Sequence, residues 1–420
     1  CGEWNLSASG AFLSTMNVEQ KKEFAPALAH IENLWPRLTR RIPKDSGTLI
    51  GLPRPFPIPR DGGENNNGMF QEMYYWDSYF ICLGLRGTPH QHLIEDVAEN
   101  FAYLVERFGV IPNGARFYFL SRSQPPFFTQ QIKLALEVRK TSQVSQSCEV
   151  SDHDWLARMY ALAKQEHETV WLGEAQPHHR RVHRGLSRYF DINYLHILAS
   201  CESGWDHSTR CDERWLEHLP VDLNSLLYVC ETDLAGFAAQ LGRADEAATW
   251  RDRAGQRAIA MQSTFWDDAA GFFFDYDYKN ERINPHSSLA GFYPLWAGWA
   301  SPAQAHRVVR EWLPKFLQPG GLVTTLKQEE GKQWAWPNGW APLQWIVASG
   351  LDRYGFADEA REVRRRWLNT CLRSFNQTGK FYEKYNVVGA GSAEEGLYGQ
   401  LIGFGWTNGV FVDFYNNLHR

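Results

Sequence analysis

Apolar residues recur at intervals of three and four between positions 91 and 108, as Leu93, Val97, Phe101 and Leu104 illustrate. This spacing predicts an amphipathic helix, because 3.6 residues per turn bring these positions onto one face. The same period predicts helices over nine further segments, so that roughly a dozen helices are expected in all. These segments are 18–34, 127–138, 154–163, 224–241, 245–265, 286–300, 302–316, 341–351 and 357–372.

The loops between these segments are rich in aromatic residues, glycine and asparagine, and the most unusual residue combinations fall in alternate loops. Helical hairpins arranged in a ring would gather alternate loops at one end. We therefore expect an all-α fold of the (α/α) barrel or toroid type, with long functional loops at one end. No Pro-, Ser- or Gly-rich linker divides the chain, so residues 1–420 are expected to form one domain. Residues 1–48 are expected to be a helical extension that packs on the barrel.

The composition narrows the classes of partner. The 420 residues carry a net charge of −5, which argues against nucleic acid and anionic membranes as partners. No apolar run reaches the roughly 18 residues that a membrane span needs, so we expect a soluble protein, cytoplasmic or periplasmic. The seven cysteines show no metal-binding spacing, and neither a metal nor a cofactor is expected. The oligomeric state is left open.

The segment 68–80 places Tyr74, Trp76 and Asp77 beside a turn rich in glycine and asparagine. Aromatic rings next to a carboxylate can stack on a sugar ring and bind its hydroxyl groups. The alternative is the packed start of an aromatic helix, with Asp77 as its cap. Further along, Arg122 and Gln124 stand before Pro125 and Pro126 at the expected start of a helix. An arginine in such apolar surroundings is expected to point inward and to donate hydrogen bonds.

Two acidic residues are candidates for proton transfer. Asp206 follows Trp205, and an acid shielded by an indole ring can keep its proton at neutral pH because desolvation raises its pKa. The alternatives are a helix cap or an ion pair with Arg210. Glu383 lies between aromatic residues in another loop of the alternate set, and its alternative is a surface pair with Lys384. Four tryptophans between positions 333 and 345, and a glycine-rich turn over 403–409, complete the unusual loops.

Six blocks together resemble the successive signatures of the trehalase family, in the family's order. They are MYYWDSYF, IPNGARFYFLSRSQPPFF, ESGWDHSTR, WPNGWAPLQW, EKYN and GFGWTNG, and all of them lie within residues 68–409. The resemblance implies a single (α/α)6 catalytic domain over residues 1–420 and metal-free hydrolysis of an α-glucoside by two carboxylates, with inversion at the anomeric carbon. It further implies that Asp206 is the general acid, that Glu383 is the general base, and that Arg122 and Arg184 line the sugar site. The implied sugar-binding positions are Phe70, Tyr74, Trp76, Asp77, Asn113, Gln124, Gly204, Trp334 and Trp406.

Several positions depart from the family's pattern. Met69, Leu186 and Ala335 stand where polar residues are typical, and the acid of a glycine-rich stretch is either displaced to Glu394 or Glu395 or absent. Trehalose is the expected substrate, but part of the pocket should be more apolar than in a trehalase. The alternatives are another small α-glucoside or mannoside, such as glucosylglycerate, kojibiose or a short α-glucan, or a non-catalytic sugar-binding protein.

Overall fold

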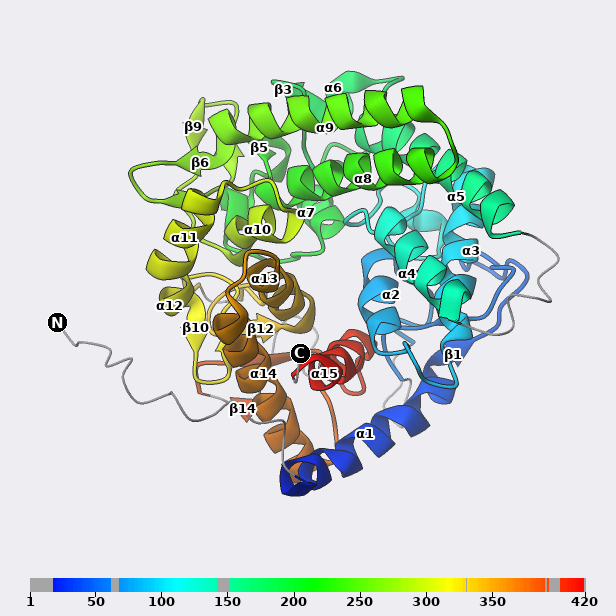
Figure 1. Ribbon diagram of the computed structural model, residues 1–420, viewed down its shortest axis with the longest axis vertical. Helices are drawn as coiled ribbons and strands as arrows, with labels where there is room; N and C mark the ends of the chain where they lie inside the picture. Colours follow the sequence, from blue (N-terminus) through cyan, green and yellow to red (C-terminus); the bar gives the residue numbers. More distant parts are fainter. Residues whose placement is uncertain are drawn as a thin grey trace.

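The computed structural model describes residues 18–61, 68–141, 151–329, 331–389, 391–392 and 401–418. Within these residues the long helices form two concentric rings, and Figure 1 shows the ring arrangement. The inner ring contains α2 (Tyr75–Leu83), α4 (Phe128–Thr141), α8 (Val221–Gln240), α10 (Tyr293–Ala297), α13 (Ala341–Arg353) and α15 (Gly405–Asn417). The outer ring contains α1 (Val18–Leu38), α3 (His92–Phe108), α5 (Asp152–Glu166), α9 (Ala244–Phe265), α11 (Pro302–Glu311) and α14 (Ala357–Thr378). This arrangement is an all-α (α/α)6 barrel, as the sequence predicts.

The pair α8 and α9 shows how burial separates the two rings, and the two helices lie side by side in Figure 1. The inner helix α8 is buried on nearly every face, because it packs against both the ring interior and the outer helix. The outer helix α9 buries one stripe that includes Ala247, Trp250 and Ala254 and exposes the rest. Its buried Arg257 donates to Glu231 of α8 at 2.8 Å, so that the buried charge is paired.

Short elements connect the helices. The strands are β1 (Thr39–Arg40), β2 (Phe56–Pro57), β3 (Arg181–His183), β4 (Leu186–Ser187), β5 (His218–Leu219), β6 (Trp266–Asp267), β7 (Phe272–Phe273), β8 (Tyr276–Asp277), β9 (Arg282–Ile283), β10 (Leu317–Gln318), β11 (Gly321–Leu322), β12 (Asn338–Trp340), β13 (Lys384–Asn386) and β14 (Gly391–Ser392). Antiparallel pairing joins β1 to β2, β3 to β4, β5 to β8 to β9, β6 to β7, β10 to β11 and β12 to β13 to β14. The short helices and turns are η2 (Phe117–Phe119), η4 (His167–Trp171), α6 (Pro177–Arg180), α7 (His196–Ser203), η5 (Arg210–Glu213), η6 (Trp215–Glu217), η7 (Leu289–Phe292) and α12 (Leu313–Phe316).

Helix positions agree with the periodicity, with instructive differences. The helix expected over 286–300 begins later, because Ser288 is extended and caps the 3-10 turn η7, and α10 ends at the left-handed Gly298. The helix expected over 302–316 is divided into α11 and α12 near Trp312. The periodicity did not predict α2, whose residues are all buried, so its sequence has no polar stripe.

The N-terminal helix α1 is part of the ring. It packs against α14 and α15 and occupies the outer position next to α15. Its buried side chains, such as Ile31 and Trp35, belong to one hydrophobic core that continues as far as Phe414. Among the described residues, no helix is both long enough and apolar enough to cross a membrane.

Candidate active site

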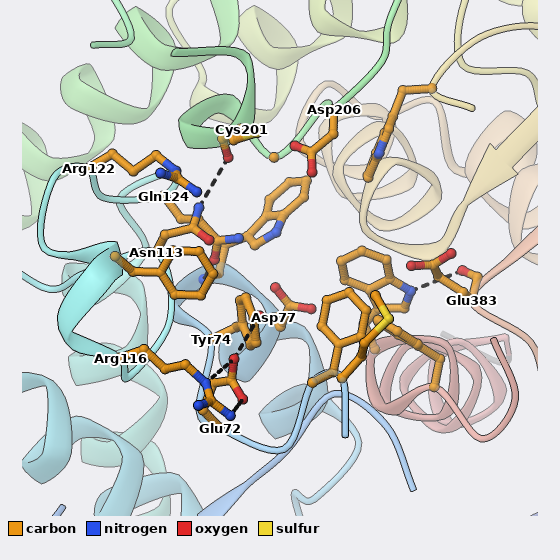
Figure 2. A pocket seen from close by; sticks show the side chains of 18 of the residues that line it. Glu72, Tyr74, Asp77, Asn113, Arg116, Arg122, Gln124, Cys201, Asp206 and Glu383 are labelled. Carbon is orange, nitrogen blue, oxygen red and sulfur yellow. Dashed lines mark hydrogen bonds and ion pairs between the residues drawn. The ribbon is translucent and has the colours of Figure 1, made fainter. Parts of the chain in front are cut away.

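The loops that lead into the inner helices enclose a pocket of about 370 Å³. Its walls come from the starts of α2 and α15, the segments before α4 and α13, the end of α7 and the residue before β13. Figure 2 shows the side chains that face it. The predicted residues that the structure brings together here are Phe70, Tyr74, Trp76, Asp77, Asn113, Arg122, Gln124, Gly204, Asp206, Trp334, Glu383 and Trp406.

Asp206 reaches the pocket from the turn that follows α7. This turn begins at Gly204, whose φ of +72° favours glycine, and a Cβ there would lie 2.6 Å from the ring of Trp76. Burial raises the pKa of the Asp206 carboxyl group to about 7; Arg122 opposes this rise and Glu383 adds to it. An ion pair between Asp206 and Arg210 is not present, because Arg210 pairs with Asp222 and Asp275 instead.

A buried ion pair supports this turn from behind. Glu202 is fully buried and accepts two hydrogen bonds from Arg180, one of them at 2.8 Å. It also accepts a hydrogen bond from the backbone N–H of Ser123 at 2.8 Å and another from Phe190 at 2.6 Å. Glu202 therefore ties the end of α7 to the segment that carries Arg122, and so holds the two sides of the pocket together.

Glu383 faces the pocket from another side, as Figure 2 shows. Its backbone N–H donates to Leu401 O at 3.0 Å, and its carbonyl oxygen accepts from the indole of Trp406 at 3.0 Å. Its carboxylate lies 3.0 Å from the ammonium group of Lys384. This pair is buried and is therefore not the surface pair considered above. Burial raises the pKa of Glu383, while Lys384 counteracts the rise.

Asp77 is another carboxyl group in the pocket, and Figure 2 shows it below Asp206 and to the left of Glu383. It occupies the first turn of α2, whose N-cap is Tyr74, so Asp77 is not the cap residue. Burial raises its pKa well above the usual range, and the charges of Glu383 and Asp206 raise it further. Asp77, Asp206 and Glu383 cannot all ionise at low cost in one pocket, so this pocket is suited to proton transfer.

Aromatic side chains line the same space. The rings of Trp334 and Trp340 stack with centroids 3.8 Å apart and nearly parallel planes. Trp76 lies 5.8 Å from Trp334, and Trp406 meets Trp76 edge-on at 5.9 Å. These flat faces next to carboxyl groups provide the surface on which a sugar ring can stack.

The arginines of the pocket are held by acids. Arg122 lies 3.3 Å from the buried Asp191, which fixes its direction. Arg116 pairs with the buried Glu72 at 2.9 Å, and the Tyr74 hydroxyl donates to the same carboxylate at 3.0 Å. Sequence reasoning did not select Arg116 or Glu72, although Arg116 stands inside one of the blocks that carry the resemblance and Glu72 directly precedes another. The other pocket residues that it did not select are Gly68, Tyr118, Phe119, Cys201, Gln333, Trp340 and Phe404.

Some residues that the sequence analysis placed in the sugar site lie outside the pocket. Arg184 is at the turn between β3 and β4, where it donates to Ser263 O and is exposed, so the structure does not place it in the pocket. Of the three apolar substitutions, Met69 lines the pocket, whereas Leu186 and Ala335 are buried outside it. Arg184 and Leu186 lie outside the pocket because the β3–β4 hairpin turns both residues toward α9. Glu394 and Glu395 lie outside the described residues.

Comparisons with known proteins identify the family of this chain. The sequence profile of the trehalase family matches residues 10–197 and 191–419. The periplasmic trehalase of Xanthomonas campestris is 36% identical over 430 residues, covering 92% of this chain and 72% of that protein. The neutral trehalase of Saccharomyces cerevisiae has a similar structure, with a TM-score of 0.74 and 28% identity, covering 86% of this chain and 73% of that one. A mannosylglycerate hydrolase of Thermus thermophilus shares the fold, with a TM-score of 0.68 and 17% identity, covering 93% and 99% of the two chains. The chain therefore belongs to the trehalase family and is a glycoside hydrolase.

Proposed function

We propose that this protein hydrolyses trehalose with inversion, and that Asp206 is the general acid and Glu383 the general base. The observation that carries the proposal is the presence of both carboxyl groups in one enclosed, aromatic-lined pocket. The family membership and the relatives named as trehalases support trehalose as the substrate.

The surroundings of the two acids support different roles. With a pKa raised to about 7, Asp206 carries a proton for much of the time at neutral pH and can donate it to the glycosidic oxygen. Burial raises the pKa of Glu383 as well, but the Lys384 ammonium group at 3.0 Å opposes this rise and stabilises the carboxylate, which is the form that acts as a base. Glu383 would take a proton from water, and the resulting nucleophile would attack the anomeric carbon opposite the departing oxygen. The products are one molecule of glucose formed as the β-anomer and a second glucose.

The substrate-binding residues are proposed on the same geometry. The tryptophans and Phe70 offer apolar faces, whereas Asp77, Asn113, Gln124 and Arg122 offer hydrogen-bonding groups. Gln124 accepts a hydrogen bond from the backbone N–H of Trp76 at 3.2 Å, and Asn113 donates to Cys201 O at 3.1 Å. These bonds link the start of α2 to the segment before α4, and that segment to the end of α7, so the sugar-binding wall is assembled before substrate arrives.

The test is trehalose hydrolysis by the wild type and by Asp206→Asn and Glu383→Gln, with proton NMR of the first product. Each substitution removes a proton transfer that contributes about 10²–10⁴-fold, so kcat should fall by at least about 100-fold while the fold persists. The control is Asp268→Asn, whose side chain is 89% exposed. Inversion releases equal amounts of β-glucose, from the attacked ring, and α-glucose, from the leaving group, so a first product that contains α-glucose alone would contradict it. Near-normal activity of folded Glu383→Gln would contradict its assignment as the base.

The compartment is a separate part of the proposal. The Xanthomonas campestris relative is named a periplasmic trehalase, and we propose the periplasm for this protein as well. The described cysteines are free thiols that are buried or half-buried, and such thiols are protected from oxidation in either compartment. Fractionation of the native host, with the protein detected by antibody, distinguishes the periplasm from the cytoplasm.

A further inference from the structure

Large apolar side chains are exposed beside the mouth of the pocket. Tyr118 is 53% exposed, Ile192 63%, Tyr194 51%, Leu195 51% and Ile197 50%, and together they are called the apolar rim. Among the described residues, the other large apolar side chain with comparable exposure is Ile259 at 74%, on the outer helix α9. Isolated exposed apolar side chains are common, whereas a group of them on one part of the surface marks a binding site.

The apolar rim is continuous with the pocket. Tyr118 lines the pocket and is also half exposed, so it belongs to both. The backbone N–H of Ile192 donates to Ser121 O at 3.1 Å, which fixes the 191–197 segment against the segment that carries Tyr118 and Arg122. Asp191 strengthens this junction, because it accepts from the Ser121 hydroxyl at 2.8 Å and lies 3.3 Å from Arg122.

The 192–197 part of the apolar rim is on the side of the general acid, because the neighbouring Asp191 pairs with Arg122, whereas the Tyr118 ring lies near Arg116. Leu195 and Ile197 stand at the start of α7, and the same helix ends beside Gly204 and Asp206. Arg122 faces the Asp206 carboxyl group closely enough to lower its pKa, and in Figure 2 both residues lie on the side of the pocket away from Glu72. Because the general acid protonates the departing oxygen, the leaving group must extend on this side.

We propose that the apolar rim binds the leaving group of α-glucosides whose aglycone is an alkyl or aryl group, so that such glucosides are a second class of substrate. The inference rests on the proposed function, since it uses Asp206 as the acid. In the reaction Asp206 protonates the glycosidic oxygen and the bond from the anomeric carbon to that oxygen breaks. Water activated by Glu383 supplies the new oxygen, and the products are β-glucose and an alcohol or phenol. The apolar part of the leaving group lies along Ile192 and Leu195, which removes apolar surface from water on the substrate and on the protein.

The experiment compares kcat/KM for octyl α-glucoside, below its micelle concentration, with kcat/KM for methyl α-glucoside. Both substrates present the same glucose, so their ratio isolates the aglycone. We expect the wild-type ratio to be at least about tenfold, which corresponds to about 1.4 kcal/mol. In the double variant Ile192→Ser and Leu195→Ser the ratio should fall by about tenfold. The matched control is Ile259→Ser, an equally exposed isoleucine on α9, which should retain the wild-type ratio.

A wild-type ratio near one, or a ratio that the double variant leaves unchanged, overturns the proposal. A double variant that alters the oligomeric state in light scattering while the ratio is unchanged also overturns it and identifies the apolar rim as a contact between copies of the chain. If neither trehalose nor methyl α-glucoside is hydrolysed, the proposed function fails separately. Binding of the octyl group by the apolar rim is then tested by the Kd values of octyl and methyl α-glucoside, measured by tryptophan fluorescence. Equal Kd values would overturn the proposal that the apolar rim binds the leaving group.

Discussion

Asp206 illustrates how the environment of one side chain sets its chemistry. Its carboxyl group shares the pocket with Glu383 and Asp77, and Arg122 is the cation that lowers its pKa. Burial nevertheless dominates, so the pKa is raised to about 7 from an ordinary value of 3.8. The folded protein therefore holds a proton that the unfolded chain releases at a much lower pH.

This difference predicts a pH-dependent stability. Below about pH 4 the Asp206 carboxyl group is protonated in both the folded and the unfolded state. Between about pH 4 and 7 it is ionised in the unfolded chain but still protonated in the folded protein, so the free energy of unfolding of the wild type falls as pH rises. The variant Asp206→Asn has no proton to lose at this position. Its free energy of unfolding, relative to that of the wild type, should therefore rise by up to about 1.4 kcal/mol per pH unit in that range. Urea unfolding at pH 4.5, 5.5 and 6.5 measures the gain. Asp268→Asn is the control, and a constant difference between Asp206→Asn and wild type would contradict the prediction.

Met69 provides a second prediction at the residue scale. It lines the pocket at a position where the family resemblance implies an arginine. The variant Met69→Arg adds guanidinium donors for sugar hydroxyl groups, and one hydrogen bond to a charged group contributes about 1.5–3 kcal/mol. We expect kcat/KM for trehalose to rise at least about threefold, measured by glucose release. Met69→Leu is the size control; an equal rise in that variant would show that hydrogen bonding is not the cause.

At the scale of elements, the loops that enter the inner helices carry the chemistry and the helices position them. The turn after α7 is the clearest case, since Glu202 anchors it and Gly204 allows it to pass Trp76. Helix packing thus determines the direction in which Asp206 points.

Gly204→Ala should therefore damage both folding and catalysis. The left-handed backbone alone costs about 1–2 kcal/mol with an L side chain, and contact with the Trp76 ring adds to this cost and displaces Asp206. Gly109→Ala is the matched control, because Gly109 has a φ of +74° but its Cβ would meet nothing within 4 Å. We expect both variants to lose stability in thermal unfolding, but kcat for trehalose to fall, by about tenfold or more, in Gly204→Ala alone. Equal kcat losses in the two variants would contradict the role of the Trp76 contact.

At the scale of the whole molecule, the described residues share one core, and α1 completes the outer ring beside α14 and α15. We propose that the chain folds as a single catalytic domain. The N-terminal segment, expected from the sequence to be an extension on the barrel, would then unfold together with the catalytic site.

Ile31→Ala tests this cooperativity. Ile31 is fully buried between α1 and the ring, and truncation of such a side chain costs about 2–5 kcal/mol. In a single domain this cost lowers the midpoint of the only transition, whether it is followed by circular dichroism or by loss of activity. Ile259→Ala, at an exposed isoleucine, should leave the midpoint unchanged. An activity transition that Ile31→Ala does not shift would show that α1 unfolds separately.

Local patterns in the sequence were sufficient to predict most helices and the two candidate acids. Helices such as α3 and α9 are half exposed, so each displays a polar and an apolar face with a period of 3.6 residues. Asp206 and Glu383 stand in short blocks of unusual composition, which can be recognised without knowing what lies next to them. The structure places both in one pocket, while their catalytic roles stay predictions.

Only the tertiary structure decided which residues meet. The sequence cannot show that Glu202 binds Arg180 and Ser123, because the latter pairing joins positions 79 residues apart. Periodicity did not reveal α2, since a helix buried on every face has no polar stripe. The family resemblance placed Arg184 in the sugar site, whereas a hairpin turns it away from the pocket. The apolar rim likewise exists only because two distant loops pack side by side. Spacing along the chain reports the surroundings of one segment, whereas contacts between segments follow from how the helices pack around the barrel.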